Sequence, residues 1–89
     1  MAKRNKLEIM RDILNIVQNN KEIKPTPLLR QSNISSSRFK KYFSELSDKD
    51  FIKSVYGERN EKLIVLTNKG ERFLEKYKTI INFIEEFEL

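Results

Sequence analysis

The stretch NISSSRFKKYFSEL, residues 33–46, places three consecutive serines directly before a segment in which basic and aromatic residues are interleaved. Serine is a poor residue for a helix interior but a good one for capping a helix N-terminus. The apolar residues that follow are spaced for one side of a helix: Phe39, Tyr42, Phe43 and Leu46. The pattern predicts a helix over residues 35–48, capped by Ser35 and attached to the domain by its apolar side.

The other faces of this predicted helix carry small side chains near its start and basic side chains further along. Its candidate contact residues are Ser36, Ser37, Arg38, Lys40 and Lys41. Small side chains let a helix approach another molecule closely, and serine, lysine and arginine are typical donors to phosphate. The alternative is that the serines only begin the helix and the lysines only keep its outer side in solvent. For Ser35 we favour that purely structural role.

Two helices are predicted before this segment. Residues 6–17 form an amphipathic helix, because apolar residues recur at spacings of three and four. Its expected core stripe is Leu7, Met10, Ile13, Leu14 and Val17, widened by Ile9 and Ile16. Residues 26–33, TPLLRQSN, form a short helix with Thr26 as its N-cap and Pro27 at the first helical position. Asn33 tolerates left-handed backbone geometry and is expected to close a tight turn into the next helix.

Two strands and a long helix are predicted after it. FIKSVY (51–56) and KLIVLT (62–67) are rich in residues that favour strands, and the polar GERNE between them predicts a hairpin with a five-residue loop. A very short strand is also possible at residues 23–24. Residues 68–89 are expected to form one helix, with Thr67 as its N-cap.

This order of elements predicts a mainly α fold with a small β-hairpin, which is the order of a winged helix-turn-helix. A chain of 89 residues is expected to form one small unit. Within it, residues 1–67 would form the winged helix-turn-helix DNA-binding domain. Residues 68–89 would form a long C-terminal helix for dimerisation.

Charge is distributed unevenly along the chain. The net charge is +5, yet residues 1–44 hold ten Lys or Arg against three Asp or Glu, whereas residues 45–89 hold eight against ten. A basic half predicts a polyanionic partner, although a merely basic soluble surface is the simpler alternative. In a winged helix the third helix enters the DNA major groove. We therefore expect double-stranded DNA as partner, with helix 35–48 in the groove and hairpin 51–67 as the wing.

The predicted hairpin offers two further DNA contacts. Arg59 lies at its tip and is the best wing candidate, with Lys62 second. Glu58 and Glu61 flank Arg59, which weakens the prediction, and a solvated loop tip is the alternative. A basic N-terminal arm is a further possibility, as is a frayed terminus, at Lys3, Arg4 and Lys6.

The last predicted helix carries an apolar seam. The candidate interface residues are Phe73, Tyr77, Ile80, Ile81, Ile84 and Phe87, and all but Ile81 follow a 4-3-4-3 spacing. A single small domain cannot easily cover so long and aromatic a stripe, so only its first half is expected to pack on the domain's own core. We therefore predict a homodimer. The alternative is that the whole helix folds back as core.

Composition argues against other functions. The chain has no His and no Cys, which removes the commonest catalytic and metal-binding groups. We predict no enzyme, no catalytic residue, no metal, no cofactor and no small-molecule ligand. No run is apolar enough for a signal peptide or a membrane span, so a cytoplasmic location is expected. The main alternative function is a protein-interaction or dimerisation module that does not bind DNA. Double-stranded RNA is a third partner, less suited because its major groove is too deep and narrow for a helix.

Three segments, residues 3–14, 32–52 and 66–77, resemble the archaeal winged-helix family typified by the 10a chromatin-associated DNA-binding proteins. The most specific piece is LT-x-KG-x-x-x-L, formed by Leu66, Thr67, Lys69, Gly70 and Leu74. The resemblance implies a nucleoid-associated DNA-binding protein or regulator, dimerising through an antiparallel coiled coil of C-terminal helices. The final helix is shorter here than in those proteins, so their extended rod-like dimer is not expected.

Two residues of these segments have a backbone role that can be predicted. Asp50 stands where many winged helices have glycine, and Asp tolerates left-handed geometry fairly well. Gly70 falls in the first turn of the last helix, where glycine costs stability. We expect that turn to approach another element closely.

Overall fold

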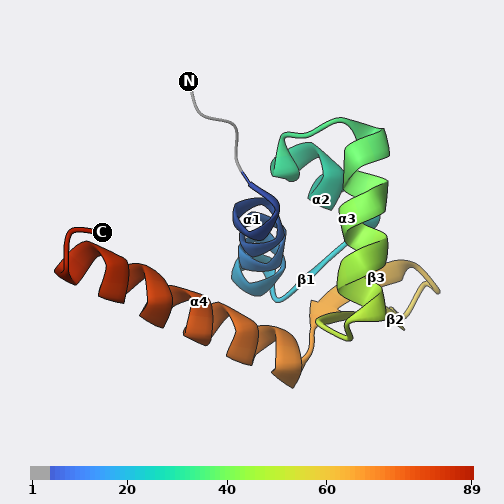
Figure 1. Ribbon diagram of the computed structural model, residues 1–89. Helices are drawn as coiled ribbons and strands as arrows, with labels where there is room; N and C mark the ends of the chain where they lie inside the picture. The colour runs from blue at the N-terminus through green and yellow to red at the C-terminus, as the bar shows by residue number, and fades with distance from the viewer. Residues whose placement is uncertain (1–4) are drawn as a thin grey trace.

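The computed structural model describes residues 5–89 and confirms the predicted order of elements (Figure 1). The elements are α1 (Lys6–Asn20), β1 (Glu22–Ile23), α2 (Pro25–Ser32), α3 (Ser36–Asp48), β2 (Ile52–Tyr56), β3 (Lys62–Leu66) and α4 (Asn68–Glu86). Helices α1, α2 and α3 pack together and against the small sheet, and α4 leaves the end of β3 and crosses beside α1 (Figure 1).

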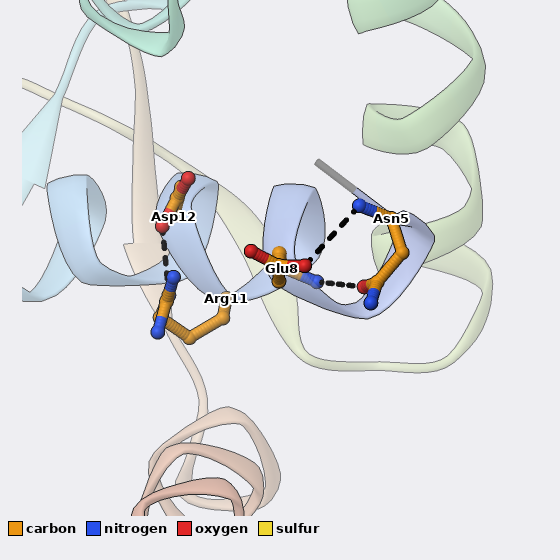
Figure 2. A network of polar contacts seen from close by, with 4 residues as sticks. All are labelled: Asn5, Glu8, Arg11 and Asp12. Carbon is orange, nitrogen blue, oxygen red and sulfur yellow. Dashed lines mark hydrogen bonds and ion pairs between the residues drawn. The ribbon is translucent and has the colours of Figure 1, made fainter. Parts of the chain in front are cut away.

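Helix α1 forms the centre of the core. Its N-terminus is closed by a capping box: Glu8 N donates to Asn5 Oδ1 (2.8 Å) and Asn5 N donates to Glu8 Oε1 (3.4 Å) (Figure 2). Its fully buried residues are Ile9, Met10, Ile13, Leu14 and Val17. The prediction of Leu7 as core was wrong, because Leu7 lies in the first turn and its side chain is 53% exposed, while Ile9 takes the buried position.

The three strands form one antiparallel sheet in the order β1-β3-β2. In the hairpin, Ile52 pairs with Leu66 and Tyr56 with Lys62, as the predicted strands require. The short first strand is real but lies one residue earlier than expected, and it pairs Ile23 with Ile64. This pairing buries Ile23 and Ile64 under α1 and gives the hairpin a third strand.

Helix α2 begins one residue earlier than the sequence suggested. Its N-cap is Lys24, not Thr26, and Pro25 lies in the first turn. Lys24 makes no side-chain capping bond there. Proline explains the shift, because Pro25 already has the backbone φ of a helix and has no N–H that needs a partner. At the other end Asn33 is left-handed (φ 58°), which confirms the tight turn into α3.

Helix α4 begins as predicted and ends sooner. Thr67 is its N-cap, and Thr67 Oγ1 accepts a hydrogen bond from Gly70 N (3.0 Å) while donating to Asp50 O (2.6 Å). The helix ends at Glu86 instead of continuing to Leu89, because Glu88 is left-handed (φ 55°) and Leu89 N donates back to Ile84 O (2.9 Å). Asp50, in the turn after α3, is also left-handed (φ 63°), as expected.

Only the first half of α4 packs on the core. Gly70 and Leu74 are buried, and the Phe73 ring lies 4.9 Å from that of Phe51. The C-terminal half of the helix extends past α1 (Figure 1). The alternative in which the whole helix folds back as core is therefore wrong for this chain, because Ile80, Phe83 and Phe87 are each more than half exposed.

Candidate nucleic-acid interface

The start of α3 is built by the serines. Ser35 has extended backbone geometry and its Oγ accepts a hydrogen bond from Arg38 N (3.3 Å), so the predicted N-cap is confirmed. Ser37 Oγ lies 3.4 Å from Ser35 Oγ. Ser36 and Ser37 are both exposed, in the first turn of the helix. No acidic residue stands in that turn, so the positive end of the helix dipole meets no carboxylate there.

The basic side chains of α3 lie away from the core. Phe39 and Leu46 are buried, and Tyr42 and Phe43 are half-buried against the same core. The three cations Arg38, Lys40 and Lys41 are all exposed. Within residues 5–89 no ion pair engages any of the three, so their charges are available to a partner.

One carboxylate on α3 is tied to α1. Glu45 Oε1 lies 2.7 Å from Lys6 Nζ, which joins the start of α1 to the second half of α3. The hydrogen bond from Lys6 lowers the pKa of Glu45, and the nearby charges of Lys49 and Lys41 add to that effect. Lys6 therefore belongs to the fold and not to a free arm. The other predicted arm residues, Lys3 and Arg4, lie outside the described residues.

The wing is the β2–β3 hairpin, and both predicted wing residues are exposed. Lys62 Nζ lies 6.0 Å from the centroid of the Phe43 ring, so the structure brings this lysine to α3. Arg59 is at the loop tip, where Glu61 Oε2 accepts a hydrogen bond from its backbone N–H (3.0 Å).

Tyr56 is an exposed aromatic residue of the wing that the sequence patterns did not single out. It pairs with Lys62 across the hairpin, and its side chain is 64% exposed. The only sequence signal for Tyr56 was its position in β2, where alternate residues point to the same face of the sheet. Tyr56 lies on the same face as the buried Ile52, but beyond the edge of the core.

Other kinds of site have little support in the described part of the chain. No group of three or more His, Cys, Asp or Glu residues there could hold a metal ion. An open groove of about 430 Å³ separates α1 from α4. Its one arginine is already engaged, because the Arg11 guanidinium lies 5.1 Å from the Tyr77 ring centroid and Arg11 Nε donates to Asp12 Oδ1 (2.7 Å; Figure 2). None of the described helices is both long and apolar enough to cross a membrane.

Comparison with known proteins agrees with this architecture. The winged helix-turn-helix family model matches residues 3–85, which is nearly the whole chain. The protein belongs to the winged helix-turn-helix family. An uncharacterised protein of Methanocaldococcus jannaschii is 35% identical over 83 residues, which cover 93% of this chain and 36% of that protein. The chain thus spans about a third of the length of this relative.

Solved winged helix-turn-helix structures have the same fold. Sso10a-2, a DNA-binding protein from Sulfolobus solfataricus, superposes with a TM-score of 0.75 at 21% identity, covering 96% of this chain and 86% of its own. SSV1 F-93 gives a TM-score of 0.67 at 26% identity, with 89% and 91% covered. The reduced form of MarR from E. coli gives 0.70 at 15% identity, with 82% and 55% covered. The predicted fold class and the resemblance to archaeal winged-helix proteins are confirmed.

Proposed function

We propose that the protein binds double-stranded DNA as a homodimer, with α3 in the major groove and the β2–β3 hairpin as a wing along the backbone. Its role would be that of a transcriptional regulator or a chromatin-associated protein in the cytoplasm, without a cofactor and without catalysis. The observation that carries the proposal is the first half of α3. It combines exposed small hydroxyls with three exposed cations that form no ion pair within residues 5–89.

The contacts follow from this arrangement. Ser36 and Ser37 are small enough to let the helix N-terminus approach the duplex, and their hydroxyls can donate to phosphate or to base edges. Arg38, Lys40 and Lys41 would neutralise phosphates along the groove. Arg59 and Lys62 would extend the contact to the flanking backbone. The DNA-binding description of Sso10a-2 supports the same use of this fold.

The second half of α4 supports dimerisation. Exposed fractions there are 57% for Ile80, 53% for Phe83, 38% for Ile84 and 57% for Phe87. The centroids of the Phe83 and Phe87 rings lie 4.9 Å apart, so these two exposed rings adjoin. Contiguous exposed apolar surface marks interaction sites.

A second copy would cover this surface with a matching seam and place two α3 helices on one duplex. Residues 1–67 would then bind DNA, and residues 68–89 would dimerise. Phe73 and Tyr77 are half-buried by the protein's own Phe51 and Arg11. We therefore centre the interface on Ile80, Ile81, Ile84 and Phe87.

The experiment is a DNA titration at several salt concentrations. Changing Lys40 and Lys41 to Ala should weaken binding and reduce the slope of log K against log salt by about two, because two fewer counterions are released. The matched control changes Lys76 and Lys78, two exposed lysines of α4, to Ala. Unfolding free energy should change by less than about 0.5 kcal/mol per exposed site in either variant. Unchanged affinity in the Lys40/Lys41 variant, or equal losses in both, would refute the groove assignment.

A protein-interaction module that does not bind DNA is the second candidate. The exposed apolar half of α4 favours it, because this surface needs a partner whether or not DNA is bound. Failure of the wild-type protein to bind duplex DNA at low salt would select this candidate. Stronger binding to duplex RNA than to DNA would instead select the third partner.

A further inference from the structure

The wing tip is a tighter loop than its sequence suggested. Gly57 N donates to Glu61 O (3.0 Å) and Asn60 N donates to Gly57 O (3.0 Å). Asn60 is left-handed, with φ 61°. These features describe a three-residue reversal over residues 58–60, in which a turn is followed by one left-handed residue. Arg59 is the middle residue of that reversal.

The carboxylate of Glu61 is folded into this loop. Its Oε2 accepts the backbone N–H of Arg59 at 3.0 Å. The same carboxylate lies against Gly57, where an added Cβ would overlap Glu61 Oε1 and come within 2.6 Å of Glu61 Cδ. Gly57 does not have a positive φ, so its backbone conformation does not require glycine, and its missing side chain leaves room for the Glu61 carboxylate in this position. The Glu61 carboxylate thus lies inside the loop, between Gly57 and the backbone N–H of Arg59.

The two glutamates beside Arg59, Glu58 and Glu61, therefore differ in their contacts with the loop. The Glu61 carboxylate bonds the backbone of Arg59, and no ion pair joins it to the Arg59 guanidinium in the described structure. Glu58 is exposed and makes no hydrogen bond within residues 5–89. Charge alone would predict that both glutamates oppose the binding of a polyanion. The geometry separates them, because only Glu61 holds the loop.

We propose that Glu61 is a positioning residue for Arg59: its carboxylate fixes the wing tip so that the Arg59 side chain reaches a DNA phosphate. The inference rests on the proposed function. An ordered loop binds more tightly than a flexible one, because less conformational entropy is lost on binding. The favourable effect of this order then exceeds the repulsion between one solvent-screened carboxylate and the DNA.

The test compares two substitutions that remove the same charge from the same loop. Glu58→Ala should strengthen binding to a duplex DNA probe by up to about threefold, because it removes a screened repulsion. Glu61→Ala should weaken binding by about threefold to tenfold, the value of a lost hydrogen bond. Glu61→Gln keeps an acceptor oxygen and should bind at least as tightly as the wild type. Equal strengthening by Glu58→Ala and Glu61→Ala would overturn the proposal.

Two further measurements distinguish a positioning role for Glu61 from a general role in holding the wing together. In an Arg59→Ala background, Glu61→Ala should no longer weaken binding, whereas loss of the whole wing structure would still weaken it. Hydrogen exchange of the Arg59 amide should be faster in Glu61→Ala than in the wild type without DNA, and equal rates would count against the inference. If the Lys40/Lys41 variant weakens binding but Glu61→Ala does not, only this inference fails. If the wild type binds no duplex DNA, both proposals fail.

Discussion

Replacing Gly70 with Ala tests the packing where α4 begins. Ala is normally favoured over Gly in a helix by about 1 kcal/mol, so propensity alone predicts a more stable protein. A Cβ at Gly70 would instead overlap the carbonyl oxygen of Phe51 and lie 2.8 Å from Leu66 Cδ1. The structure therefore predicts the opposite sign.

The magnitude follows from what can move. The Leu66 side chain can adjust by a rotamer change, but Phe51 O is backbone and accepts a hydrogen bond from Thr67 N (3.1 Å). Displacing that carbonyl strains or breaks a bond worth about 0.5–1.5 kcal/mol. Overpacking of a tight site costs about 1–3 kcal/mol. After the propensity gain of about 1 kcal/mol is subtracted from these two costs, Gly70→Ala should lower the free energy of unfolding by about 0.5–3.5 kcal/mol.

Urea unfolding of the wild type and the variant measures this difference. With a slope of about 1–3 kcal/mol per molar urea, the midpoint should fall by about 1 M. Lys76 supplies the matched control, because it is exposed in the same helix. Lys76→Ala should be more stable than Lys76→Gly by about 1 kcal/mol, which calibrates propensity alone. A Gly70→Ala protein as stable as the wild type, or more so, would refute the close-packing argument.

Two other predictions concern the seam and the ion pair. Ile80→Asp with Ile84→Asp should turn a dimer into a monomer in sedimentation experiments and weaken DNA binding at least about tenfold, since two linked sites no longer act together; a wild-type monomer at tens of micromolar would contradict this. Lys6 lowers the pKa of Glu45 in the folded protein. The ion pair therefore stabilises the fold fully at pH values above the ordinary glutamate pKa of about 4.3. This stabilisation is lost as the pH falls through the lowered pKa. The unfolding free energies of wild type and Glu45→Gln should therefore differ at pH 6 to 7 and converge once the pH is below the lowered pKa of Glu45. A pH-independent difference would contradict the assignment.

Local rules predicted the parts of the fold that local chemistry decides. Ser35 and Thr67 were recognisable as caps because each is a hydroxyl residue placed directly before a helical pattern. Asn33 and Asp50 adopt the left-handed geometry that their residue types tolerate. The predicted start of α2 was one residue late, because Thr26 is a typical N-cap residue whereas Pro25 is typical of the first helical position. The true N-cap, Lys24, could not be recognised from the sequence, because its side chain makes no capping bond.

The features that the sequence did not predict depend on contacts between residues that come together only in the folded structure. Nothing in the sequence pairs Lys6 with Glu45, since they meet only after α1 and α3 have packed. Alternation in β2 puts Tyr56 on the same face as buried Ile52. Tyr56 is nevertheless exposed, because the core does not extend beneath that end of the strand. The wing tip is the clearest case: counting charges gave Glu58 and Glu61 the same effect, whereas the hydrogen bond to Arg59 N distinguishes them. Charge counts cannot show which way a carboxylate points.

The joint between α3 and α4 connects the two halves of the proposed function. Thr67 Oγ1 donates to Asp50 O, Thr67 N donates to Phe51 O, and the missing side chain of Gly70 lets the first turn of α4 lie against the same segment. These contacts tie the start of α4 to the turn that follows α3. In a dimer formed through α4, the spacing and angle between two α3 helices depend on this joint, because it connects the turn after α3 directly to the start of α4. A rigid joint allows both helices to meet successive major grooves without further ordering, which favours binding. The close packing at Gly70 would therefore serve the geometry of the dimer as well as the stability of the fold.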